Sequence, residues 1–169
     1  RFKISATGEA ASRQMYVPDT NVLVTRFVTP DGVAEMYDCM PIEVDQRGTR
    51  ALVHNLVRVV HGVRGTVELE LVCQPAFDYA RVGHSVKPTH HGCVFTSNAP
   101  VGEMPGCVSL LASVPLSLEN GVARAKFTVH EGEWVGVVLE WVNGHQPATT
   151  LPPTIDLRRT VQASVDYWQ

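Results

Sequence analysis

The sequence predicts an all-β fold, an antiparallel β-sandwich over residues 1–150 with a C-terminal linker helix in 151–169. Three observations support this prediction of an all-β fold. Short apolar segments recur along the chain, Gly, Pro, Asn and Asp separate them, and no helical periodicity alternates with them. About eight strands at such spacing are typical of a sandwich or barrel. A length of 169 residues suits one domain with its own core.

The first predicted strands form a hairpin. Residues 21–28 and 33–40 are rich in apolar and β-branched side chains, and a Pro-Asp-Gly turn separates them. Pro30 presets φ, Asp31 tolerates the turn, and Gly32 can adopt a positive φ. We therefore expect these two segments to pair antiparallel.

The next segments predict two further strands. Residues 51–62 fit a strand or a helix, and their Val content and the closing Gly62 favour a strand. Residues 66–73 alternate between the two faces of a strand. One face carries Val67, Leu69, Leu71 and Cys73, and the other carries Glu68, Glu70 and Val72. The segment Gly-Val-Arg-Gly at 62–65 is interpreted as a turn between the two strands.

Three apolar segments follow a Gly/Pro-rich loop. Residues 107–118 are expected to form one strand, and Glu-Asn-Gly at 119–121 a turn. Residues 122–129 then alternate, with one face made of Ala123, Ala125, Phe127 and Val129. Residues 134–142 are apolar on both faces, which predicts a central strand.

The pattern changes at the end of the chain. Residues 143–153 contain several prolines and are expected to form a semi-stiff connector. Residues 154–168 have helical periodicity, with Thr154 as the expected N-cap and Asp156 in the first turn. The apolar positions on one helix face are Leu157, Val161, Val165 and Trp168. We expect these four residues to contact a neighbouring domain.

Charge and hydropathy exclude several kinds of partner. The net charge of −3 gives no basic surface for nucleic acid. The most apolar stretch, 133–142, falls short of the roughly 20 residues that span a bilayer. The four cysteines form no CxxC pair and lie in or beside apolar runs, which predicts buried free thiols and a cytoplasmic protein. The chain starts without Met and ends directly after an aromatic residue, so we expect a fragment of a longer protein.

Two glutamates on one strand, Glu68 and Glu70, resemble a catalytic pair only in their spacing. Side chains two residues apart lie about 7 Å apart, inside the roughly 6.5–9.5 Å separation found in inverting glycosidases. Catalytic carboxylates must flank the bond from opposite sides, whereas these point the same way. We expect them to be the solvent face of the strand, and we expect a structural role for Asp38, Glu43 and Asp45 as well.

Other residue types with catalytic or binding chemistry also lack a specific pattern. The spacing of His84, His90, His91 and Cys93 matches no zinc motif, so we expect no metal. Nucleophile-elbow and phosphate-loop motifs are absent from the sequence. The aromatic candidates for a sugar-stacking platform are Trp134, Trp141, Tyr79 and Tyr167, and packing is favoured for three of them. The sequence predicts no catalytic residue and no cofactor.

An ordered series of motifs resembles a known enzyme family. The segments are YVPDTNVLVTRFVTPDGVAEMYDCMP (16–41), LVRVVHGVRGTVELELVCQPAFDYAR (56–81), HHGCVF (90–95) and DYW (166–168). Together they resemble the N-terminal domain of bacterial glucoamylases and trehalases of glycoside hydrolase family 15. The resemblance implies a large β-sandwich, a linker helix and a helical (α/α)6 barrel that follows. It also implies inverting hydrolysis of α-glucosidic bonds by two barrel glutamates, for which residues 1–169 contain no counterpart.

The chain departs from the family at its start. A strand with a Gly-Ser-Ile-Asp-Trp-like sequence precedes the position of Arg1 in the family. We therefore expect missing first strands, unpaired edges and self-association of the fragment.

Three functions remain open. The first is a non-catalytic domain that supports its own catalytic barrel and contributes a loop to the active-site rim. The second is an independent carbohydrate-binding module, and the third is a stand-alone interaction domain. The substrate of the parent stays open among trehalose, maltooligosaccharide and dextran, because the specificity pockets lie outside this chain.

Overall fold

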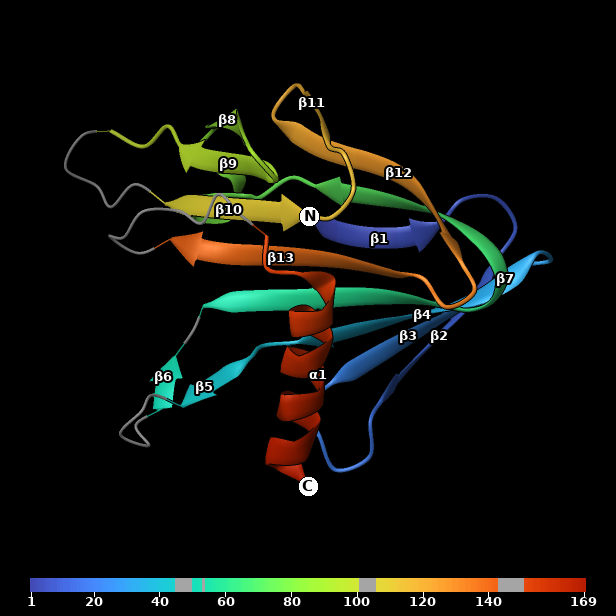
Figure 1. Ribbon diagram of the computed structural model, residues 1–169. Coiled ribbons are helices and arrows are strands. Elements are labelled where there is room, and N and C mark those ends of the chain that lie inside the picture. The colour runs from blue at the N-terminus through green and yellow to red at the C-terminus, as the bar shows by residue number, and fades with distance from the viewer. Residues whose placement is uncertain (45–49, 53, 101–105, 143–150) are drawn as a thin grey trace.

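A computed structural model describes residues 1–44, 50–52, 54–100, 106–142 and 151–169 (Figure 1). The fold is all-β with a C-terminal helix, as the sequence predicts. The strands are β1 (Phe2–Ala6), β2 (Ala11–Tyr16), β3 (Leu23–Val28), β4 (Gly32–Cys39), β5 (Ile42–Val44), β6 (Arg50–Leu52), β7 (Asn55–Cys73), β8 (His84–Thr89), β9 (Gly92–Ser97), β10 (Cys107–Ala112), β11 (Ser117–Glu119), β12 (Val122–His130) and β13 (Trp134–Val142). A short 3-10 turn, η1 (Asp78–Ala80), and the helix α1 (Thr154–Trp168) complete the described elements. No helix in these described ranges has the length and apolar character needed to cross a membrane.

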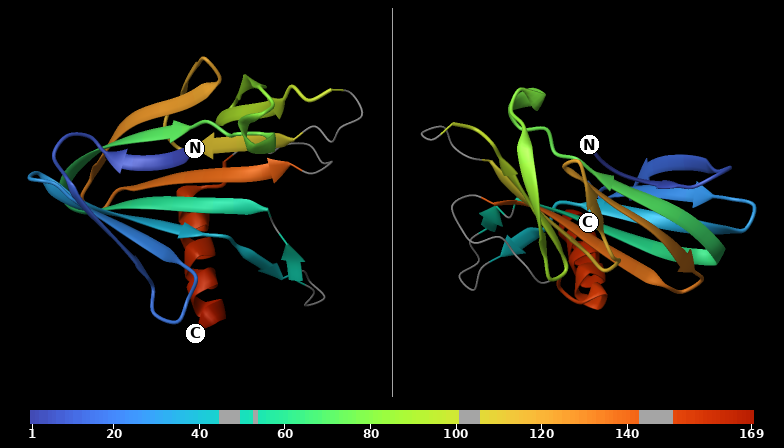
Figure 2. Two further views of the ribbon diagram at one scale, coloured as in Figure 1. Left: turned by 180° about the vertical axis from the view of Figure 1, so that it is seen from behind. Right: turned by 90° about the horizontal axis from the view of Figure 1, so that it is seen from above.

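Strand β7 links two antiparallel layers. Its first half lies in a long sheet with the order β2-β3-β4-β7-β13-β10-β9-β8. Its second half pairs with β1 and β12, and β11 pairs with β12, which makes a short sheet. Figure 2 shows β7 bending from one layer into the other. We call the face of the long sheet toward the short sheet its inner face, and the face toward α1 its outer face.

The segment 62–65 bends the chain without reversing it. The prediction of a turn between two strands is wrong, because β7 runs continuously over 19 residues. The register with β4 passes from Ala34 opposite Gly62 to Val33 opposite Arg64, so Val63 forms a β-bulge. A side chain at Gly62 would overlap the carbonyl of His130. The glycine therefore permits close backbone approach where the strand changes sheets, and it does not end the strand.

The β3–β4 hairpin is confirmed, but Gly32 has a different role from the one predicted. The two strands pair from Leu23 opposite Asp38 to Val28 opposite Val33. Gly32 does not have a positive φ. Instead, a Cβ at this position would lie 2.5 Å from the backbone nitrogen of Thr66. Glycine is required here by the close contact with β7.

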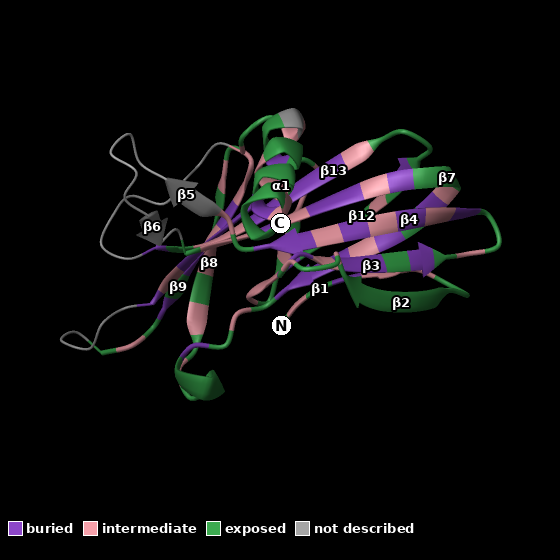
Figure 3. Ribbon diagram, turned by 90° about the horizontal axis from the view of Figure 1, so that it is seen from below, coloured by how far each residue is buried: buried purple, intermediate pink, exposed green. Residues whose placement is uncertain are grey.

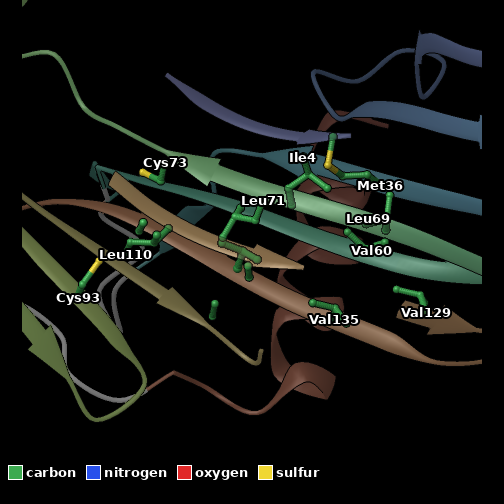
Figure 4. Close-up of a cluster of buried hydrophobic side chains, with 14 of the residues drawn as sticks. Ile4, Met36, Val60, Leu69, Leu71, Cys73, Cys93, Leu110, Val129 and Val135 are labelled. Carbon is green, nitrogen blue, oxygen red and sulfur yellow. The ribbon is translucent and has the colours of Figure 1, made fainter. Parts of the chain in front are cut away.

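The core lies between the two sheets (Figure 4). The predicted alternation of residues 66–73 is confirmed for the inward face, since Val67, Leu69, Leu71 and Cys73 are buried while Glu68 is exposed; on the other face, Val72 is also buried. The short sheet also contributes Ile4, Ala123, Ala125 and Val129. The inner face of the long sheet supplies Phe27, Ala34, Met36, Val60, Phe95, Leu110, Val135 and Val137.

Later strands agree with the sequence in part. Strand β13 pairs with both β10 and β7, which confirms its central position. The segment 107–118 does not form one strand, because β10 ends at Ala112 and β11 begins at Ser117 in the other sheet. Asn120 and Gly121 adopt positive φ in the turn between β11 and β12.

Strand β2 is exposed along its length at the edge of the long sheet (Figure 3).

Helix α1 packs across the outer face of the long sheet and has the predicted bounds. Leu157 is buried against Val59 and Val138, and any side chain at Gly136 would overlap it. The predicted N-cap is wrong, since Thr154 is the first helical residue. Pro153 precedes it, and its carbonyl accepts hydrogen bonds from the amides of Asp156 (2.9 Å) and Leu157 (3.2 Å). The predicted connector falls mostly in 143–150, outside the described residues.

The four cysteines are free thiols. Cys39, Cys73 and Cys93 are buried, and Cys107 is partly buried. Burial raises the pKa of Cys73 and of Cys93 to about 12. Thiols with such pKa values are protonated and unreactive at neutral pH, so they act as small apolar side chains in the core.

Candidate functional site

A row of polar and aromatic side chains crosses the outer face of the long sheet. Arg26 of β3 lies opposite Glu35 of β4, and Glu35 lies opposite His61 of β7. His61 in turn lies opposite Trp134 of β13. Directly opposed residues on neighbouring strands project to the same face. The sheet register therefore assembles four side chains that are far apart in the sequence.

The carboxylate in this row is fully engaged. Arg26 forms an ion pair with Glu35, and the hydroxyl of Tyr37 donates a 2.6 Å hydrogen bond to Glu35 Oε2. Burial alone would raise the pKa of Glu35, but the hydrogen bonds from Tyr37 and Arg26 outweigh it and lower the pKa. Burial and the bond to Glu35 raise the pKa of Tyr37 to about 12. At neutral pH, Glu35 is ionised and Tyr37 remains a hydrogen-bond donor.

Trp134 connects this row to the helix. The rings of His61 and Trp134 stack with centroids 4.0 Å apart and an interplanar angle of 14°. The guanidinium carbon of Arg158, on α1, lies 4.0 Å from the Trp134 ring centroid, a cation–π contact. The pKa of His61 is lowered, first by burial and also by Arg158, while Glu35 acts in the opposite direction. These contacts fix the helix against the row.

A groove of about 350 Å³ lies between α1 and the outer face. Its lining residues are Tyr37, Val59, Trp134, Arg158, Arg159, Val161 and Gln162. Arg158 and Gln162 stand four residues apart, so they share one side of the helix. The volume lies at the lower end of the range of small-molecule sites. Two aromatic and two aliphatic side chains beside guanidinium and amide groups suit binding of a small polar molecule.

A second cavity of about 520 Å³ lies on the inner face, beside β1 and β2. Here Asp38 forms an ion pair with Arg58, whose guanidinium lies 4.2 Å from the ring centroid of Phe2. Arg58 also donates a 3.3 Å hydrogen bond to the carbonyl of Phe2. The structural role predicted for Asp38 is confirmed. Asp45 and the side chain of Glu43 lie outside the described residues.

Glu68 and Glu70 lie on the solvent side of β7, as predicted. Glu70 lies 3.5 Å from Arg124 of β12 in an exposed ion pair. Glu68 accepts a 3.2 Å hydrogen bond from the hydroxyl of Thr7. Both carboxylates project from one face of the same strand, so they do not face each other across a gap.

The four residues predicted to contact a neighbouring domain divide into two groups. Leu157 is only 3% exposed, and Val161 and Val165 pack beside it on the chain's own sheet. Trp168 is 46% exposed and makes an edge contact with Tyr167, with ring centroids 5.3 Å apart. Contact of any of them with another domain stays a prediction.

The histidine segment is dispersed along β8 and β9. His84 Nε2 lies 2.8 Å from the carbonyl oxygen of Gly121, and its ring contacts Phe95. His90 and His91 contact each other, with centroids 4.3 Å apart. Cys93 points into the core. Across the ranges that the structure describes, no three His, Cys, Asp or Glu side chains are arranged to hold a metal ion.

The aromatic candidates occupy separate positions. Trp134 lines the groove, and Trp141 packs on Phe77, with ring centroids 6.4 Å apart. Tyr79 is 90% exposed at the turn η1, where its backbone has a positive φ. Tyr167 lies near the end of α1. The groove residues Tyr37 and Arg158 and the neighbouring His61 are not distinguished by any local motif, although alternation within 33–39 would place Glu35 and Tyr37 on one face.

The fold and the groove define a class of protein: a β-sandwich domain with a docked C-terminal helix and a small groove beside it. No family model matches the chain. The chain is 34% identical over 106 residues to the trehalase of Mycobacterium tuberculosis (strain ATCC 25618 / H37Rv), covering 61% of this chain and 15% of that protein. It is 28% identical over 164 residues to the trehalase of Mycolicibacterium smegmatis (strain ATCC 700084 / mc(2)155), covering 88% of this chain and 24% of that protein.

These similarities confirm the resemblance to trehalases that the sequence motifs predict. The chain spans less than a quarter of the length of either relative, at 15% and 24%. Most of each trehalase therefore lies outside the region that this chain resembles.

Proposed function

We propose that this chain is a non-catalytic domain of a trehalase-like, inverting glycoside hydrolase, where it supports a separate (α/α)6 catalytic barrel. The observation that carries the proposal is the extent of the matches. They cover 61% and 88% of this chain, yet only 15% and 24% of the two trehalases. Such coverage leaves most of a trehalase-sized protein available for the catalytic domain.

The engagement of the carboxylates supports a non-catalytic role. Inverting hydrolysis needs one carboxylic acid and one carboxylate on opposite sides of the scissile bond. Glu35 is bound to Arg26 and Tyr37, and Asp38 is bound to Arg58. The hydrogen bonds to Glu35 lower its pKa and keep it ionised, which is the opposite of what a general acid requires.

Glucose release tests the proposal directly. The longer parent protein and this 169-residue chain would be assayed side by side with trehalose, maltose and soluble starch. We expect glucose from trehalose with the parent and none with the chain. Activity of the chain by itself would contradict the non-catalytic assignment, and an inactive parent would contradict the trehalase-like one.

A second function, an independent carbohydrate-binding module, is favoured by one feature, the aromatic walls of the groove formed by Tyr37 and Trp134. Aromatic rings beside hydrogen-bonding side chains are suited to sugar recognition. Calorimetric titration of the chain with trehalose and maltooligosaccharides separates the two functions. A supporting domain does not bind these neutral sugars by itself, whereas a binding module does.

Exposed Trp168 supports a proposal about the partner surface. With Leu157 buried on the sheet, Trp168 and its neighbour Tyr167 are the apolar side chains of α1 that remain accessible at its C-terminal end. We propose that this end of the helix contacts the catalytic domain, or a second copy of the chain when that domain is missing. Light scattering of wild type and Trp168→Ser over a range of concentrations would test the second case, and a wild-type monomer at all concentrations would exclude it.

A further inference from the structure

One cation in the groove has no acidic partner. Arg26 is paired with Glu35, and Arg159 lies 3.3 Å from Asp156. Arg158 forms no ion pair within the described ranges, and its described contact is the stack on Trp134. The guanidinium carbon lies 4.0 Å from the Trp134 ring centroid, and a ring face leaves the N–H donors of a guanidinium without an oxygen acceptor. Trp134 therefore holds Arg158 at the groove with donors available.

Two other polar groups of the groove are already engaged. The hydroxyl of Tyr37 donates to Glu35, and the amide of Gln162 donates a 2.8 Å hydrogen bond to Asp166. Val59 and Val161 provide apolar walls. The site thus combines a single available cation with a mostly apolar, ring-sized space.

The charges in the lining favour an anion over a neutral molecule. Two arginines line the groove, and among the described residues no acidic side chain does. The carboxylate of the row, Glu35, is ionised, and its negative charge is compensated by the ion pair with Arg26. A carboxylate or phosphate would supply the oxygen acceptors that match a guanidinium, and such charge-assisted hydrogen bonds are about twice as strong as neutral ones.

We propose that the groove binds a small organic oxyanion, a carboxylate or phosphate ester carried on a single ring. Arg158 holds the oxyanion, and the ring body lies between Tyr37 and the two valines. Trp134 is a positioning residue, because it fixes the guanidinium. This site is independent of the supporting role proposed above, since it rests on the groove alone.

Isothermal titration calorimetry on the 169-residue chain tests the ligand class. Glucuronate and glucose 6-phosphate carry the two candidate anions on the same ring, and glucose is the matched neutral compound. We expect saturable binding of one or both anionic sugars and much weaker binding of glucose. Binding of glucuronate alone assigns a carboxylate, and binding of glucose 6-phosphate alone assigns a phosphate ester. Binding of none of them, or equal binding of glucose, would overturn the proposal.

Inorganic phosphate tests the ring-sized part of the site. It carries the oxyanion without a body that could fill the apolar space. We expect it to bind more weakly than the better anionic sugar. Equal affinity would overturn the ring requirement, because the valine walls would then contribute nothing.

Variants of Arg158 test its role. R158Q removes the charge, and we expect roughly tenfold weaker binding, as for loss of a hydrogen bond to a charged group. R158K keeps the charge without the planar fork, so its affinity should fall between those of R158Q and wild type. Gln and Lys are as helix-compatible as Arg, and the position is exposed, so both variants keep the fold.

Arg13 provides the matched control. It lies on exposed β2, opposite Arg26, and outside the groove lining. R13Q makes the same charge change on the sheet that α1 covers and should leave affinity unchanged. Unchanged binding in R158Q, no recovery in R158K, or an equal loss in R13Q would each contradict the assignment of Arg158.

Discussion

The two faces of the long sheet use the same strands for different purposes. Along β4, Ala34 and Met36 point inward to the apolar core, while Glu35 and Tyr37 point to the outer face. The inner face is covered by a second sheet, whereas the outer face is covered by one helix. A helix covers less area than a sheet, so polar side chains beside it remain accessible. Alternation thus lets one face supply the apolar core and leaves polar side chains accessible on the other.

The largest effect is expected from a cavity in the core. Leu69 is fully buried between the sheets, and L69A should lower the free energy of unfolding by about 4 kcal/mol. Urea denaturation followed by circular dichroism measures the change. The matched control is E68A, one residue away on the solvent face, which should change stability by less than about 0.5 kcal/mol. Similar losses in both variants would contradict the assignment of the two faces.

A nearly equal effect is expected where the inner face carries charge. Arg58 and Asp38 form a buried ion pair beside Phe2. R58M should cost about 3 kcal/mol, because it leaves the Asp38 carboxylate without its partner in a low-dielectric site.

The double variant R58M/D38L provides the control for this pair. It removes the unpaired charge and should recover much of the loss. No recovery would show that Arg58 acts through packing on Phe2 alone. Urea midpoints of the three proteins decide between these results.

Much of this architecture could be predicted from local sequence. The alternation in 66–73, the central strand 134–142 and the helix 154–168 each depend on a periodicity within one segment. The continuous β7 could not be predicted in this way, because the bulge at Val63 depends on the backbone of β4 and on His130, far along the chain. Local chemistry also suggested Thr154 as the N-cap, but Pro153 takes the position before the helix.

The groove and the row beside it could not be predicted from local sequence for a similar reason. Glu35, His61 and Trp134 become neighbours only through the register of three strands. Arg158 reaches them because α1 crosses the outer face, and nothing in the helix periodicity specifies that crossing. These four residues share no sequence motif, and only the tertiary structure brings them together.

A smaller effect is expected where the helix meets the outer face. Leu157 is the buried anchor of α1, and L157A should cost about 2 kcal/mol, at the lower end for buried leucines. The lower value is expected because a single helix can shift and partly close the cavity.

Hydrogen exchange would locate this loss. The amides of α1 should lose more protection than those of β7, and binding at the groove should weaken with them. R159A is the control for hydrogen exchange alone, since Arg159 is exposed on the same helix and its loss should leave the protection of the α1 amides unchanged. Uniform loss of protection across both layers would contradict separate contributions from the two faces.

The smallest effect is expected from pH. Burial and Arg158 lower the pKa of His61 in the folded state, so the unfolded chain binds this proton more readily. The contribution of His61 to the free energy of unfolding is fully present above its unfolded pKa of about 6.5. It is lost as the pH falls through the lowered pKa of the folded state. Arg26 and Glu35 lie beside it on the sheet and Arg158 on the helix, so the proton would enter a site already occupied by ion-paired and cationic groups.

The difference between wild type and H61Q isolates this contribution. Between pH 7.5 and 5.5, wild type should lose up to about 1 kcal/mol more unfolding free energy than H61Q, since His61 is only partly buried and solvent screens its charge. H90Q, at an exposed position of the β8–β9 turn, should follow wild type. Equal pH dependence in wild type and H61Q would contradict this prediction, because it would mean that the outer face accommodates a protonated His61 without loss of stability.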